Sequence, residues 1–226
     1  MDTNIIIFLI LFILYLYESR KETFTINKRT RPFIQSMTRS EIAIVSFYCA
    51  EDITYELYSI QNYKHYTSLY NLALYIFNIP PNLNINEKSK IKYQAINYVL
   101  NKHKYVIWMN LNSIFNNLNI NVTKYISQYK KFDIIISNNI IILKNTLFTQ
   151  NIIKKVLNGK HLNKNIQFRL LIKNNKKLLI LPKNKLSFEP SKDNIKNNSY
   201  ILDFNNYTKL YLKQIIISIN NKLDII

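Results

Sequence analysis

The chain has 226 residues, enough for one sizeable hydrophobic core, and a 48% share of hydrophobic residues excludes a wholly disordered protein. Its 31 Lys and Arg residues against 13 Asp and Glu residues give a formal net charge of +18. The lysines are scattered along the chain and form no basic helix or repeated aromatic-basic motif, so we expect no nucleic-acid partner.

A long apolar stretch opens the chain. Residues 5–17 are all apolar, which is short for a full span of about 20 residues but sufficient for a short anchor. The stretch lacks the small residues of a signal-peptide cleavage site and has no polar face. We therefore predict an uncleaved N-terminal membrane-anchor helix over residues 1–20, a basic stem over residues 21–40 and a folded domain over residues 41–226.

The folded domain alternates two kinds of pattern. Runs rich in β-branched and aromatic residues predict strands at residues 41–48, 72–77, 105–109, 133–137, 140–144, 177–181 and 200–204. Apolar residues that recur every three or four positions predict helices at residues 52–69, 89–103, 122–129, 149–157 and 207–220. The fourth helix stops before Gly159, the only glycine. This alternation predicts an α/β fold with a mostly parallel sheet flanked by helices.

In such folds, ligands bind beyond the carboxyl ends of the strands. Ser46 and Tyr48 end the first predicted strand. Asn110 and Asn112 follow another strand at a spacing of two residues, which places both side chains on one face of an extended chain. We therefore expect these four residues to lie near one binding site.

Several segments match, in order and spacing, the motifs of one known family. They are residues 42–48, the pair Asn62 and Tyr66, Lys92 near the start of a helix, Trp108-Met109-Asn110-Leu111-Asn112, residues 132–137, residues 142–146 and residues 201–204. With them the chain resembles the Golgi galactosyl- and mannosyltransferases of the α-1,2-galactosyltransferase type, over about residues 41–215. The resemblance implies a GT-A fold and the transfer of a hexose from a nucleoside diphosphate sugar to a glycan acceptor. It also implies a single-pass membrane protein of the secretory pathway.

The resemblance implies a donor site made of Ser46, Tyr48, Lys92, Asn110 and Asn112. The family's strand ends in Trp-x-Asp-x-Asp, and this chain has Asn at both acidic positions, with Asp203 in place of the family's metal-contacting His. Asn110, Asn112 and Asp203 are thus the expected metal set.

An Asn carbonyl is neutral, whereas one unit charge pair at about 4 Å contributes on the order of 4 kcal/mol at an effective dielectric constant of about 20. Binding of Mn²⁺ or Mg²⁺ is therefore expected to be weakened.

Two consequences of the missing carboxylates stay open. Lys92 and other cations would hold the diphosphate directly. Alternatively, the chain is a catalytically inactive relative that acts as a membrane-tethered binding or structural protein.

The side of the membrane on which the folded domain lies is open as well. Basic residues such as Arg20 and Arg31 follow the anchor and favour a cytoplasmic domain, whereas the resemblance favours a lumenal one. Asp133 is expected to be a strand-edge polar residue, with a donor-site role as the alternative.

Overall fold

The computed structural model describes residues 32, 34–36, 39–49, 53–182, 187–188, 201–203 and 209–223. The predicted anchor lies outside the described residues, as does most of the predicted stem. No helix in the described part of the chain combines the length and apolar character needed to cross a membrane.

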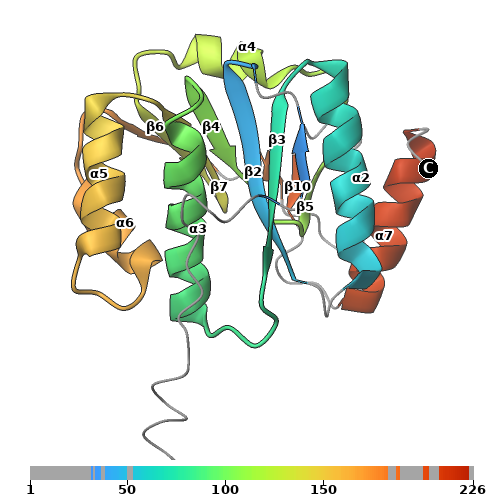
Figure 1. Ribbon diagram of the computed structural model, residues 1–226. Helices are drawn as coiled ribbons and strands as arrows, with labels where there is room; N and C mark the ends of the chain where they lie inside the picture. Colours follow the sequence, from blue (N-terminus) through green and yellow to red (C-terminus); the bar gives the residue numbers. More distant parts are fainter. Residues whose placement is uncertain are drawn as a thin grey trace, which may run out of the picture.

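The main sheet has seven strands in the order β1-β3-β2-β4-β7-β6-β8. Its strands β2 and β3 lie side by side in Figure 1. β1 and β7 run antiparallel to their neighbours, and the other strands share one direction, so the sheet is mixed but mostly parallel. β1 falls within the segment predicted as stem and pairs with β3. The strands are β1 (Ile34–Ser36), β2 (Ile42–Cys49), β3 (Ala73–Ile79), β4 (Tyr105–Trp108), β6 (Ile134–Ser137), β7 (Ile140–Lys144) and β8 (Leu178–Ile180).

Helices cover both faces of this sheet. One face packs against α3 (Ile85–Leu100), α5 (Leu147–Asn158) and α6 (Lys164–Ile172), and the other against α2 (Ile53–Leu69) and α4 (Val122–Gln128). Successive strand residues point to opposite faces, so Val45 and Phe47 join the first layer while Ile44 and Tyr48 join the second. Burial on both faces explains why the strands are continuous apolar runs. The predicted α/β architecture is confirmed.

A small second sheet lies beside α2. Its order is β5-β10-β9, with β5 (Ser113–Phe115) antiparallel to β10 (Ile201–Asp203) and β9 (Ser187–Phe188) parallel to β10. In this register the Cα partner of Asp203 is Ser113. The last helix, α7 (Lys209–Lys222), packs along α2 (Figure 1).

Within the described residues, the predicted strands and helices of the folded domain are present with shifted ends, and four further elements were not predicted. α3 begins four residues earlier than predicted because Asn84 and Glu87 form a capping box at its start. α6 was missed because it exposes apolar Ile166 and Leu170, which blurs the helical pattern. The other elements missed are the short strands β1, β5 and β9.

Gly159 ends α5 as predicted, but with an extended φ of −69° rather than the left-handed conformation of a glycine stop. A Cβ at this position would lie 2.5 Å from the Gln167 side chain. The atoms that it would meet are the end of this flexible side chain, which would have to move to admit a Cβ.

The α2 helix holds β5 through a buried amide. Asn62 Nδ2 donates to the Phe115 carbonyl at 3.0 Å, and Phe115 N donates to Asn62 Oδ1 at 2.8 Å. The same amide reaches Asn220 of α7 at 3.2 Å. Tyr66 stacks on the Phe115 ring, with centroids 3.6 Å apart. The Asn62 side chain thus supplies the two hydrogen bonds that a neighbouring strand would otherwise make with the backbone of Phe115.

We predict that Asn62→Ala lowers the free energy of unfolding by about 2 kcal/mol or more, because it leaves two buried backbone groups of Phe115 without their partner. Urea unfolding of the purified domain measures the change. Asn151→Ala, at an exposed position of α5, is the matched control and is expected to change the value by less than about 0.5 kcal/mol. Equal losses in the two variants would contradict the role of Asn62.

Candidate functional site

A cavity of about 310 Å³ opens at the carboxyl edge of the main sheet, between α3 and α6. The ends of β2, β4 and β6 contribute Phe47, Trp108 and Ile136 to its lining. The two-residue turn between β6 and β7 contributes Asn138 and Asn139. The cavity therefore occupies the part of the sheet at which α/β folds bind their ligands.

The cavity lining is electropositive. It contains Lys88, Lys92 and Arg169, and none of its described residues is Asp or Glu. Its other polar residues are mostly amides, namely Asn110, Asn138, Asn139 and Asn165, together with Ser89. Cations without acidic neighbours in a concave site attract anionic ligands.

Two helices form the walls and are fixed to each other by hydrogen bonds. Lys164 N at the start of α6 donates to Ser89 Oγ of α3 at 2.9 Å. Tyr93 Oη of α3 donates to Asn165 Oδ1 of α6 at 3.2 Å, and its ring lies 5.2 Å from that of Phe168. The spacing between the walls is thus set by the protein itself.

Lys92 is half-buried in the α3 wall. Its Nζ lies 5.2 Å from the centroid of the Trp108 ring and 5.6 Å from that of Tyr93. Burial lowers the pKa of Lys92 to about 7, and the positive charge of Arg169 acts in the same direction. An anion in the cavity would favour the charged form of Lys92.

Trp108 borders the cavity. It is fully buried, and its ring lies 5.1 Å from that of Phe47. Its indole Nε1 is buried without a hydrogen-bond partner among the described residues. Trp108 thus belongs to the hydrophobic core, and the same side chain also borders the cavity.

Tyr63 of α2 fixes the turn that carries Asn110. Its hydroxyl lies 2.6 Å from the Asn110 carbonyl oxygen and 2.8 Å from that of Ser113, so one hydroxyl hydrogen is shared between two acceptors. The Asn110 carbonyl also accepts from Ser113 N at 3.0 Å. The position of Asn110 at the cavity is therefore set from the opposite face of the sheet.

Of the predicted donor-site residues, the structure brings Lys92 and Asn110 into one cavity. Ser46 and Tyr48 are buried and lie on the face of β2 opposite to Phe47, while Asn112 is half-buried in the turn between β4 and β5. None of these three belongs to the described lining of the cavity. Their part in donor binding stays a prediction.

The described cavity residues do not fit a divalent cation. Mg²⁺ and Mn²⁺ prefer carboxylate oxygens among protein ligands, whereas the cavity offers neutral amides beside three cations. No cluster of potential metal ligands is found among the described residues. The register of β10 brings the backbone of Asp203 next to the turn that holds Asn112, and the side chain of Asp203 lies outside the described residues. The predicted set of Asn110, Asn112 and Asp203 therefore stays untested.

Sequence patterns missed part of the cavity. Arg169 and Asn165 lie on α6, which was not predicted as a helix. Asn138 has a left-handed φ of 51°, a conformation that asparagine tolerates better than most residues. The Asn138-Asn139 pair before an apolar run was the one available indication of this tight turn.

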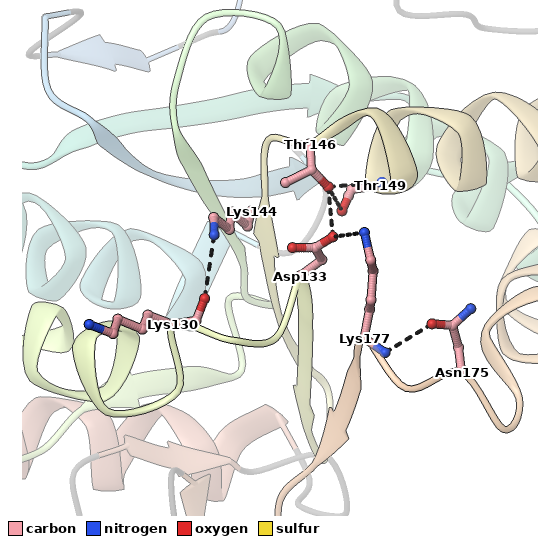
Figure 2. A network of polar contacts seen from close by, with 7 residues as sticks. All are labelled: Lys130, Asp133, Lys144, Thr146, Thr149, Asn175 and Lys177. Carbon is pink, nitrogen blue, oxygen red and sulfur yellow. Dashed lines mark hydrogen bonds and ion pairs between the residues drawn. The ribbon is translucent and has the colours of Figure 1, made fainter.

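Asp133 lies at the start of β6, away from the cavity. Its buried carboxylate accepts from the Thr146 hydroxyl at 3.0 Å and pairs with Lys177 Nζ at 3.2 Å (Figure 2). Thr146 is in turn the N-cap of α5 and accepts from Thr149 N. Asp133 is thus a strand-edge residue that secures the start of α5, and it takes no part in the cavity.

The solved structures that this chain is similar to include a glycosyltransferase involved in the glycosylation of the major capsid of PBCV-1. The identity is 11%, the TM-score is 0.62, and the match covers 78% of this chain and 98% of that chain. The glycosyltransferase GlyE of Streptococcus pneumoniae TIGR4 matches with a TM-score of 0.46 and 10% identity, over 82% of this chain and 64% of that one. A putative nucleotide-diphospho-sugar transferase from Desulfovibrio desulfuricans G20 matches with a TM-score of 0.44 and 12% identity, over 81% and 98%.

These likenesses concern the fold. The match with a TM-score of 0.62 shows that the described domain shares its fold with a glycosyltransferase, as the GT-A resemblance implied. The two matches with TM-scores below 0.5 support no conclusion about this chain. No protein-family model matches the chain, and a search of curated proteins finds no match.

We predict that Lys92→Met stabilises the ligand-free protein at about pH 7. The folded protein has a Lys92 pKa of about 7 against an ordinary value of 10.5, so between these values the unfolded chain binds a proton that the folded protein does not. The resulting penalty on the folded state is complete below about pH 7 and disappears as pH rises toward 10.5. The advantage of the Met variant is therefore expected to shrink from about pH 7 to about pH 9.

Urea unfolding of both proteins across this pH range measures the difference. Lys154→Met, at an exposed position of α5, is the control and is expected to show a difference that does not vary with pH. A Lys92→Met variant that is less stable than the parent at every pH would contradict the assignment.

Proposed function

We propose that this protein is a glycosyltransferase that binds a nucleoside diphosphate sugar in the cavity between α3 and α6 and transfers its hexose to a glycan acceptor. The observation that carries the proposal is a concave, electropositive site at the carboxyl edge of a glycosyltransferase-like sheet. The predicted membrane anchor and secretory-pathway location belong to the same proposal and rest on the sequence resemblance.

The chemistry of the lining supports a sugar phosphate. Lys88, Lys92 and Arg169 supply charge for the phosphates. The amides of Asn110 and Asn165 each carry donors and an acceptor, the combination that sugar hydroxyls require. A volume of about 310 Å³ is at the small end of ligand pockets and suits the sugar with its phosphates, with the nucleoside extending beyond.

A second candidate is a non-catalytic protein of the same fold that binds the donor and does not transfer it. It is favoured by the composition of the described lining, which offers no carboxylate to serve as a general base or nucleophile. The two candidates share the binding site and differ in turnover.

We predict that UDP- or GDP-sugars change the fluorescence of Trp108. Trp108 is the only tryptophan of the chain and borders the cavity, so the signal reports this site alone. Uridine and guanosine, which lack phosphate, are the control ligands and are expected to bind at least about tenfold more weakly.

Release of free sugar from the donor, followed in the same samples, separates the enzyme from the non-catalytic binder. If no UDP- or GDP-sugar changes either the Trp108 fluorescence or the melting temperature, the proposed function is wrong.

A further inference from the structure

We infer that the cavity holds the diphosphate of its ligand directly between Lys92, Lys88 and Arg169, without a bridging divalent cation. The inference rests on the proposed function for the identity of the ligand. It concerns how the negative charge of the diphosphate is neutralised. The GT-A resemblance leads one to expect a metal ion held by carboxylates in this role.

The three cations have no acidic partner in the described structure. The described ion pairs join Lys104 to Glu41 and Lys177 to Asp133, and neither pair reaches the cavity. Lys92 and Lys88 lie on one wall and Arg169 on the other, so an anion between the walls would be contacted from both sides. Lys92 is half-buried, feels the positive charge of Arg169 and has no acidic partner among the described residues, so a bound anion would offset this repulsion.

The same arrangement opposes a metal ion. A divalent cation in the cavity would meet three positive side chains and only neutral oxygens, such as that of Asn110. A metal–diphosphate complex carries less negative charge than the free diphosphate, so this lining favours the free form.

Hydrogen bonds join the two helices that carry the cations. The hydrogen bonds from Lys164 N to Ser89 and from Tyr93 to Asn165 fix α6 on α3 at the level of the cavity. The cavity is also bordered by the first turns of both helices, whose N-terminal ends carry partial positive charge. The two helices that carry the cations are therefore fixed relative to each other before any ligand arrives, which lowers the entropic cost of binding.

Direct contact couples binding to protonation of Lys92. The charged groups that face it are Lys88 on its own helix and Arg169 on α6, both positive, while burial raises the pKa of neighbouring Tyr93 well above its usual range and keeps it neutral. From β4 it meets uncharged Trp108. An anion raises the Lys92 pKa from about 7, so binding above this pH takes up a proton and weakens as pH rises.

The test compares UDP, GDP and inorganic pyrophosphate as ligands of the full chain, in EDTA and in MnCl₂, by Trp108 fluorescence and calorimetry. We expect dissociation constants in EDTA within about threefold of those in Mn²⁺. Lys92→Met and Arg169→Gln are each expected to weaken binding by about tenfold or more, and the exposed control Lys154→Met to leave it unchanged. Calorimetry in buffers of different ionisation enthalpy at about pH 8 should show proton uptake that Lys92→Met abolishes.

The outcomes separate this inference from the proposed function. Nucleotide binding that requires Mn²⁺, or equal affinity of Lys92→Met and Lys154→Met, overturns the metal-free site and leaves the function intact. Pyrophosphate binding in EDTA without binding of either nucleotide supports the diphosphate site and contradicts the function. Absence of binding by all three ligands overturns both. Urea unfolding of Lys92→Met at the pH of the binding assay shows whether the variant is folded, and thus separates loss of binding from unfolding.

Discussion

The contact on which the cavity depends is the hydroxyl of Tyr63 between the carbonyl oxygens of Asn110 and Ser113. The chain turns sharply where β4 leaves the main sheet and β5 enters the small one, and a turn of this kind leaves backbone acceptors to be satisfied. Tyr63 satisfies them from a helix, and Asn62 holds the next strand in the same way. Tyr66 extends the pattern by donating to the Ile120 carbonyl and accepting from Val122 N. One face of α2 thus determines the path of residues 110–122.

With this arrangement, one face of the sheet makes structural contacts and the other face borders the cavity. The face covered by α2 and α4 is occupied by structural contacts, and it fixes the backbone of Asn110. The face covered by α3 and α6 is left with a cavity whose walls are held apart at a constant spacing. A precise polar site on one face of a thin sheet needs this support from the other, because a small displacement of the turn would move Asn110 out of the cavity.

The positive charge of Lys92 in the cavity is a local cost to stability. A half-buried lysine whose pKa is lowered to about 7, with an arginine nearby and no described acidic partner, is an arrangement that folding alone would not favour. By contrast, the buried carboxylate of Asp133 pairs with Lys177 and accepts a hydrogen bond from Thr146. Unpaired charge gathered in a concave site is typical of functional sites, where stability is lost in favour of ligand binding.

The sequence by itself determined the longer strands and most of the described helices, because β-branched runs and helical periodicity act over a few neighbouring residues. It also indicated the sheet edge where Asn110 would lie and the family of folds to which the domain is similar.

Only the tertiary structure decided which polar residues meet. Arg169 joins Lys92 across some 77 positions of sequence through α6, whose exposed Ile166 and Leu170 obscure its helical pattern. Ser46 and Tyr48 lie on the same strand as Phe47 but point to the opposite face, as the alternation of strand side chains requires.

The interpretation that changes most is that of the two asparagines after β4. In the sequence they are a metal site without its carboxylates, and in the structure Asn110 borders a cavity whose charge comes from lysine and arginine on two packed helices. Such convergence depends on long-range packing, which no local pattern encodes.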